Sequence, residues 1–298
     1  MDRLPAAIAA AFPDLAGATI EPLGEGHDCR TWMVAGDVVV KEPLHPAASA
    51  ALALEARVLA VLAGKITLTI PNPRFCTGPP ALSRHDLLPG QQLLWDDFAA
   101  LTAAERDLLA QDLARFHAEC HSVLTVELRA AGADPAKPWP APDTARAALD
   151  ALPSSHRALA REVLAGWAAL PEDPLGEVWG HFDAHGWNMA FDPVQRRLSG
   201  IYDFGDSGFG PLHRDLIYSA LISFDLTLRL GRAYRALTGL PIDLDRLRLL
   251  SGAHRLWELA EADDANRDWQ VQAFLRWSAG VAANSTAYVA SDAAAPGG

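Results

Sequence analysis

The character of this 298-residue chain changes at Pro89-Gly90. Before that point, short β-prone runs alternate with turn residues, at 20–23, 31–34 and 38–40. After it, apolar side chains recur at helical spacing, as in the run of Leu109, Leu113, Phe116 and Cys120. A β-rich part followed by a helical part predicts an α+β fold. We therefore expect two lobes, residues 1–90 and 91–298, with a ligand cleft between them.

The same signals place the remaining elements. The spacing predicts a short helix within residues 1–15, a helix at 49–62, and strands at 67–70 and 81–88. Thr102 and Glu105 form a predicted capping box at the start of the first helix after the boundary. Later helices are expected at 155–169, 211–237, 244–262 and 267–285, with a surface loop at 125–145 and a disordered tail at 291–298.

Composition narrows the class of protein. The formal net charge of -12 argues against a nucleic-acid surface and is compatible with a cationic ligand. The three cysteines lack metal-ligand spacing, which favours a reducing compartment. No signal peptide and no apolar run of membrane-spanning length is recognisable. We expect a cytoplasmic protein, monomeric or homodimeric, with no nucleic-acid or membrane partner.

The segment from His181 to Asn188 carries the clearest chemical signal. Asp183 is followed five residues later by Asn188 and twenty residues later by Asp203, with short apolar runs between them. Two hairpin strands would bring Asn188 and Asp203 together. One acid to accept a hydroxyl proton, with Asn and Asp oxygens to hold magnesium, is what phosphoryl transfer requires. Separately, Asn188 is compatible with a turn and Asp203 with a strand-end cap, but the three together favour the chemistry.

Lys41 is a candidate phosphate-binding residue in the first lobe. It ends the run 38–40 in a chain that has only three lysines, and a compact ammonium suits a phosphate. The simpler interpretation is a side chain that extends from a strand end to water. Glu55 favours the phosphate-binding interpretation, because it lies on the apolar stripe of the helix at 49–62 and needs a buried partner. Lys41 is the expected partner.

Gly24 and Gly26 lie in the turn between the first two β-prone runs. Glycines at such a turn let backbone amides approach phosphates without obstruction. An ordinary hairpin explains the same pattern, and the position of the turn ahead of Lys41 is what favours a nucleotide loop.

These motifs together resemble the aminoglycoside phosphotransferase-like family, which has the protein-kinase-like fold. The family pattern His-x-Asp-x-His-x-x-Asn, followed by Asp-Phe-Gly, matches 181–188 and 203–205. The resemblance implies that Asp183 is the catalytic base, with His185 bracing its loop, and that Asn188 and Asp203 hold Mg²⁺. It also implies that Lys41, oriented by Glu55, holds the phosphates of ATP beneath the loop of Gly24 and Gly26. Phe182 and Trp187 depart from the usual pattern and are expected to reshape the acceptor pocket.

The acceptor is expected to lie against the late helices. Acidic residues gather there near Trp257 and Trp269; they are Glu258, Glu261, Asp263, Asp264 and Asp268. By resemblance, such a cluster would bind the ammonium groups of an aminoglycoside-type antibiotic. A solvated helix face is the ordinary alternative.

The predicted function is therefore ATP- and Mg²⁺-dependent transfer of a phosphoryl group to a hydroxyl of a small molecule, possibly an antibiotic. A metabolic kinase for a sugar, amino alcohol or amino acid is the first alternative, and a non-catalytic nucleotide-binding module is the second.

Overall fold

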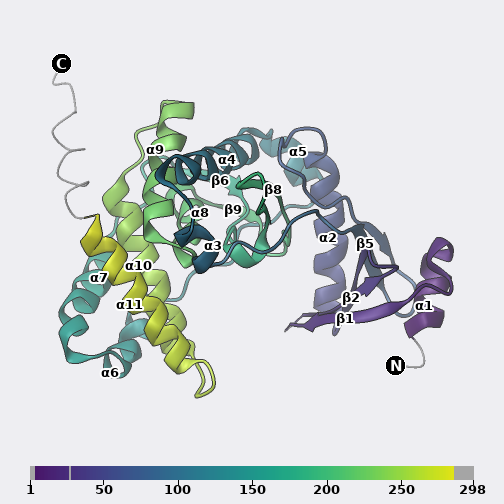
Figure 1. The fold of residues 1–298 in the computed structure, drawn as a ribbon, viewed down its shortest axis with the longest axis horizontal. Helices are drawn as coiled ribbons and strands as arrows, with labels where there is room; N and C mark the ends of the chain where they lie inside the picture. Colours follow the sequence, from purple (N-terminus) through teal and green to yellow (C-terminus); the bar gives the residue numbers. More distant parts are fainter. Residues whose placement is uncertain (1–3, 27, 285–298) are drawn as a thin grey trace.

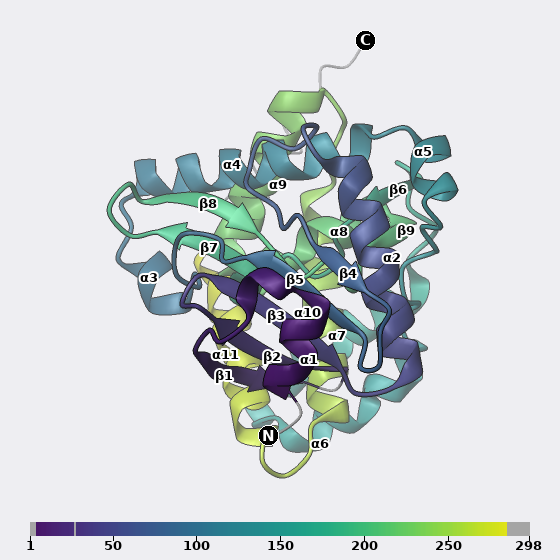
Figure 2. The ribbon, with the colours of Figure 1, turned by 90° about the vertical axis from the view of Figure 1, so that its right-hand side faces the viewer.

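The computed structural model describes residues 4–26 and 28–284. Its first part is a five-stranded antiparallel sheet in the order β1-β2-β3-β5-β4, drawn in dark purple and blue in Figure 1. The strands are β1 (Ile20–Glu25), β2 (Cys29–Val34), β3 (Val38–Pro43), β4 (Arg74–Cys76) and β5 (Leu82–Asp86). Helix α1 (Leu4–Ala11) packs on the sheet through a small apolar core that includes Ile8, Val34 and Val40. Helix α2 (Pro46–Leu62) runs beside the sheet (Figure 2).

The connection to the second part is pinned to it by backbone contacts. Gln91 and Phe191 exchange hydrogen bonds of 2.9 and 2.7 Å between their backbone groups. Gly90 has a φ of 129°, and a Cβ there would lie 2.8 Å from the carbonyl oxygen of Phe191. Only glycine combines this backbone conformation with such a close approach.

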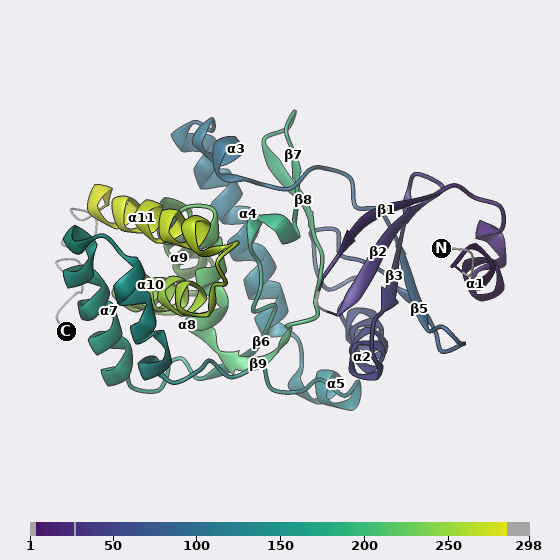
Figure 3. The ribbon, with the colours of Figure 1, turned by 90° about the horizontal axis from the view of Figure 1, so that it is seen from below.

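The second part is mainly helical and holds two small sheets, each of two antiparallel strands. The helices are α3 (Trp95–Ala99), α4 (Ala103–Ser122), α5 (Thr125–Ala130), α6 (Ala148–Ala151), α7 (Arg157–Ala169), α8 (Leu212–Asp215), α9 (Phe224–Thr238), α10 (Leu244–Glu261) and α11 (Arg267–Ala283). Strand β6 (Glu177–Gly180) pairs with β9 (Gly208–Pro211), and β7 (Met189–Asp192) pairs with β8 (Arg197–Ile201). Helices α4 and α9 lie side by side above these two small sheets, and α10 runs along α11 (Figures 1 and 3).

Most predicted elements are present, including the capping box. The backbone N–H of Glu105 donates to Thr102 Oγ1 at 3.3 Å, and that of Thr102 donates to Glu105 Oε2 at 2.7 Å. The α+β arrangement of a β-rich part followed by a helical part is confirmed. Within the described residues, no helix has both the length and the apolar character needed to cross a bilayer.

Three local predictions were wrong. The expected loop at 125–145 contains α5 and the start of a 3-10 helix, Pro142–Ala147. The expected helix at 211–237 is divided into α8, a 3-10 helix (Leu216–Leu221) and α9, because Ser223 is extended, with a φ of -160°. Residues 67–70 contribute only one bridge, between Thr69 and Gly200, since the prolines that follow cannot donate to a strand ladder. The tail at 291–298 lies outside the described residues.

Candidate active site

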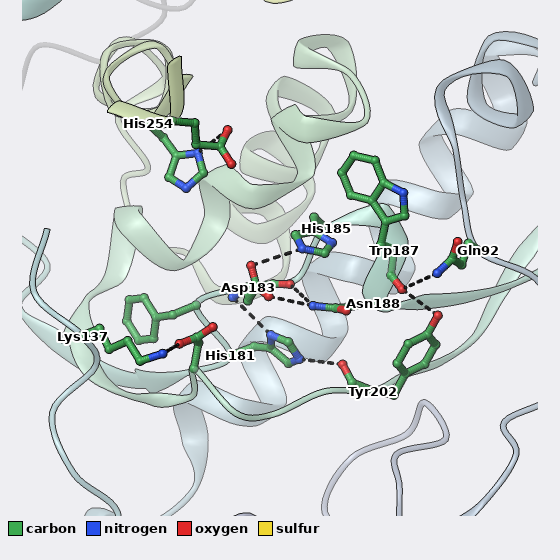
Figure 4. Close-up of polar contacts among 12 residues, drawn as sticks. Gln92, Lys137, His181, Asp183, His185, Trp187, Asn188, Tyr202 and His254 are labelled. Carbon is green, nitrogen blue, oxygen red and sulfur yellow. Dashed lines mark hydrogen bonds and ion pairs between the residues drawn. The ribbon is translucent and has the colours of Figure 1, made fainter. Parts of the chain in front are cut away.

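The loop between β6 and β7 is organised by the buried ring of His181. The backbone N–H of Asp183 donates to His181 Nδ1 at 3.2 Å, and His181 Nε2 donates to the carbonyl oxygen of Tyr202 at 3.1 Å (Figure 4). Tyr202 in turn donates its backbone N–H to the carbonyl oxygen of Asn188 at 3.0 Å. His181 thereby joins the Asp183 loop to the residue before Asp203. The predicted proximity of Asn188 and Asp203 is confirmed.

Asp183 is held by two side chains. Asn188 Nδ2 donates to Asp183 Oδ2 at 2.8 Å and to the Asp183 carbonyl oxygen at 2.9 Å. His185 Nε2 lies 3.3 Å from Asp183 Oδ1. The carboxylate keeps 28% of its surface exposed, so it is fixed in direction yet accessible from one side.

Electrostatics at this position favour a proton acceptor. Burial, and then the negative charges of Asp206 and Asp203, raise the pKa of Asp183 to about 8, against the hydrogen bond from Asn188. Burial lowers the pKa of His185 to about 4, so its ring is neutral and lies beside Asp183 without acting as a counter-ion.

Lys41 connects the sheet to the second part of the chain. Its Nζ lies 3.0 Å from Asp203 Oδ1 and 3.7 Å from Glu55 Oε1. Glu55, on α2, also accepts the backbone N–H of Phe204 at 3.0 Å. Burial favours the neutral amine, but the two carboxylates outweigh it and raise the pKa of Lys41. The predicted pairing of Lys41 with Glu55 is confirmed, and Asp203 joins it.

Asp203 differs from its two partners in its exposure. Its side chain is 52% exposed, whereas those of Lys41 and Glu55 are 15% and 7% exposed. Its φ of 63° is left-handed, a conformation that an aspartate adopts at some cost in strain. Burial opposes ionisation, but Lys41 outweighs it and lowers the pKa of Asp203, which keeps a charged oxygen available.

The glycine turn lies in register with Lys41, at the same end of the sheet. Gly24 pairs with Thr31, and Thr31 pairs with Lys41, so the three residues form a row across β1, β2 and β3. A Cβ at Gly24 would meet no atom within 4 Å, and one at Gly26 would meet only a backbone oxygen at 3.9 Å. The turn therefore leaves room above the row for a ligand, as a nucleotide loop requires.

The predicted acidic cluster is divided by the structure. Glu258 is close enough to Asp183 for its charge to raise that pKa, but it is engaged by Arg255 at 2.9 Å and His254 at 3.4 Å. The other members are exposed: Glu261 ends α10, Asp263 and Asp264 lie in the turn that follows, and Asp268 lies in the first turn of α11. Asp263 Oδ1 accepts the backbone N–H of Asn266, and Asp264 pairs with Arg267. Glu258 is the member of the cluster whose charge contributes to the raised pKa of Asp183.

Several neighbours of the site were not predicted. Lys137 Nζ lies 2.6 Å from Asp206 Oδ1, next to the Asp183 loop (Figure 4). The rarity of lysine was a usable signal, but Lys137 falls in a segment that was expected to be featureless. The carbonyl oxygen of Trp187 accepts from Tyr202 Oη at 2.6 Å and from Gln92 Nε2 at 3.2 Å. These contacts fix Trp187, whose ring lies 5.7 Å from that of Trp269.

Solved structures with the same fold are phosphotransferases. The GDP and kanamycin complex of the aminoglycoside phosphotransferase APH(2'')-IIIa is 22% identical, with a TM-score of 0.72, and covers 93% of this chain and 97% of its own. The macrolide 2'-phosphotransferase MphH from Brachybacterium faecium is 22% identical, with a TM-score of 0.64. The match covers 92% of this chain and 98% of MphH. ADP-bound APH(2'')-Ib is 18% identical, with a TM-score of 0.62, and the match covers 92% of this chain and 98% of that protein. The two-lobe, protein-kinase-like fold is thereby confirmed.

Sequence comparison is more decisive than these fold similarities. No curated protein matches at a significant level. The model of the phosphotransferase enzyme family, however, matches residues 19–250, which include Lys41, Asp183 and Asp203. The predictions of the family and of a phosphotransferase enzyme are confirmed: the chain belongs to the phosphotransferase enzyme family.

Proposed function

We propose that the protein transfers the γ-phosphoryl group of ATP to a hydroxyl of a small molecule, with Mg²⁺ as cofactor. The observation that carries the proposal is that Lys41 and Asp203 meet at 3.0 Å beside the loop that presents Asp183. A phosphate-binding cation, a metal-binding carboxylate and a proton acceptor then occupy one site, as in-line phosphoryl transfer requires. In this proposal residues 1–90 bind the nucleotide and residues 91–298 bind the acceptor.

Asp183 is proposed to be the general base. The acceptor hydroxyl would give its proton to the carboxylate as its oxygen bonds to the γ-phosphorus and the bond to the ADP oxygen breaks. Asn188 and His185 would hold the carboxylate in its direction. A base with a pKa raised towards neutrality suits this step.

The side chains that would hold Mg²⁺ fit a hard cation. Asn188 uses Nδ2 to bond Asp183, which directs its Oδ1 away, and no hydrogen bond from the described residues reaches that oxygen. The exposed carboxylate of Asp203 supplies a second oxygen. When bound, Mg²⁺ would neutralise phosphate charge.

The acceptor could be a polycation, such as an aminoglycoside, or a molecule with an apolar surface. The exposed ring of Trp269 lies against Trp187, and Glu258 is already paired with Arg255 and His254. Both observations favour an acceptor with an apolar surface over a polycation. Screening labelled ATP against macrolides, aminoglycosides and hydroxylated metabolites tests the proposal. Mg²⁺-dependent label transfer to an acceptor is the expected result. Nucleotide binding with no transfer to any class would instead support the non-catalytic alternative.

A further inference from the structure

A buried polar network lies beneath the Asp183 loop and takes no part in the chemistry described above. Its centre is Asp215, which is 0% exposed. Asp215 Oδ2 lies 2.8 Å from His117 Nδ1 and 2.9 Å from His121 Nε2, both on α4 and one turn apart. His121 Nδ1 lies 2.8 Å from Tyr234 Oη on α9. The network therefore crosses from α4 to α9, which pack side by side (Figure 1).

The second oxygen of Asp215 reaches the catalytic loop. Phe182, the residue before Asp183, donates its backbone N–H to Asp215 Oδ1 at 2.6 Å. Its φ of 56° lies in the left-handed region, which is strained for a bulky residue and persists only where surrounding contacts enforce it. A Cβ at Gly180 would lie 2.5 Å from Asp215 Cγ, so the strand before the loop also requires a glycine. Asp215 is the polar contact that holds Phe182 in this conformation.

The geometry fixes where the protons lie. Burial opposes ionisation of Asp215, but His117 and His121 outweigh it and lower its pKa, so the carboxylate is charged and only accepts. His117 must then carry a proton on Nδ1, and His121 must carry one on Nε2. With Nε2 protonated, the neutral ring of His121 accepts from Tyr234 Oη through Nδ1. Burial lowers the pKa of His121, in agreement with a neutral ring.

We propose that His117 and His121 are positioning residues, which act through Asp215 to hold Phe182 in its left-handed conformation and so direct Asp183. The inference rests on the proposed function for its effect on turnover. The arrangement of protons in the network is independent of the proposed function. A bound metal is the competing interpretation, because one ligand atom from each of His117, His121 and Asp215 lies within 4.8 Å of the others.

Amide variants test the arrangement atom by atom. An Asn side chain places an N–H near the position of His Nδ1, and a Gln side chain places one near that of His Nε2. His117→Asn and His121→Gln are therefore matched replacements, and His117→Gln and His121→Asn are mismatched ones. His117→Ala should lower kcat by about 10- to 100-fold, as expected for losing a charge-assisted hydrogen bond, and leave the KM for ATP within about twofold. His117→Asn should restore most of that loss and His117→Gln should not.

A stability control separates positioning from packing. Leu109 is a buried apolar residue of the same helix, so Leu109→Ala should lower Tm without lowering kcat at temperatures well below Tm. Equal activity of the matched and mismatched amides would overturn the proposal. So would a fall in kcat that follows Tm alone across all variants.

Two measurements need no turnover. Nitrogen-15 NMR of the imidazole rings should show protonated Nδ1 on His117 and protonated Nε2 on His121. Hydrogen exchange at the Phe182 amide should accelerate in His117→Ala and slow again in His117→Asn. This result in a protein without transferase activity would support the network while refuting the proposed function. Reversed tautomers, or stoichiometric metal in the purified protein, would overturn the proposal.

Discussion

Lys41 Nζ lies 3.0 Å from Asp203 Oδ1, although 162 residues separate them in the chain. Each residue is fixed from its own side: Lys41 by β3 and Glu55, and Asp203 by the hairpin of β7 and β8. The ion pair therefore joins the sheet to the hairpin at the point where phosphate and metal ligands are needed.

Replacing Lys41 tests its role in holding phosphates. Lys41→Ala should lower kcat/KM for ATP by about 10- to 100-fold, since a charge-assisted contact is lost. Steady-state kinetics at varied ATP measure the change. The matched control is Lys65→Ala, because Lys65 is 41% exposed and pairs with Glu127 far from the site. Equal kinetics for the two variants would reject the assignment.

Removing Lys41 also leaves Glu55 without a cation, which can destabilise the fold. Glu55→Gln addresses this, because the amide still accepts the backbone N–H of Phe204 while its charge is gone. It should raise the KM for ATP less than Lys41→Ala does, since Asp203 still pairs with Lys41.

Magnesium dependence should follow Asp203. Asp203→Asn is expected to raise the Mg²⁺ concentration for half-maximal activity by about tenfold or more, because a charged oxygen ligand becomes neutral. Asp206→Asn is the matched control. Asp206 is also acidic and close to Asp183, but it pairs with Lys137. If Asp206→Asn raised this Mg²⁺ concentration more than Asp203→Asn does, Asp206 rather than Asp203 would be assigned as the metal ligand.

Gly186 should tolerate no side chain. A Cβ there would lie 1.9 Å from the carbonyl oxygen of Leu93, whose backbone N–H donates to Gly186 at 3.0 Å. Gly186→Ala is therefore expected to reduce the free energy of unfolding by about 1–3 kcal/mol, measured by urea denaturation. Gly24→Ala should change it by less than about 0.5 kcal/mol, because no atom lies within 4 Å of the added Cβ. Similar losses at both positions would contradict the described packing.

Glu258 should make stability depend on acid pH. Burial opposes its ionisation, but His254 and Arg255 outweigh it and lower its pKa to about 2. A lowered pKa in the folded state stabilises the protein above the unfolded value of 4.5, and this contribution is lost as the pH falls towards 2. The contribution is at most about 3 kcal/mol. The difference in unfolding free energy between wild type and Glu258→Gln should be constant above about pH 5.5 and shrink below pH 4.5. Glu261→Gln, at an exposed position, should show no such trend.

Contacts that are signalled by nearby residues could be predicted from the sequence, whereas contacts between distant segments could not. The pairing of Lys41 with Glu55 was predictable, because a carboxylate on an apolar helix stripe needs a partner and few are nearby. The proximity of Asn188 and Asp203 was predictable from two apolar runs joined by a turn. The pairing of Lys41 with Asp203 was not, since nothing local relates a strand to a hairpin so distant in sequence.

The other omissions have the same cause. Lys137 lies in an irregular segment whose position is set by tertiary contacts, so spacing carried no information about it. The contacts of Asp215 were not predictable, because its partners His117 and His121 look like ordinary helix residues until α4 lies against the loop. The division of the helix near Ser223 was hidden by an apolar period that continues through it.

The most direct test of Asp183 as catalytic base compares single-turnover phosphoryl transfer and nucleotide binding in wild type and Asp183→Ala, with Asp183→Asn as the closer mimic in shape. The expected result is a fall in transfer rate of about 10²- to 10⁴-fold with the Kd for ATP nearly unchanged. Weakened nucleotide binding with transfer preserved at saturating ATP would contradict it.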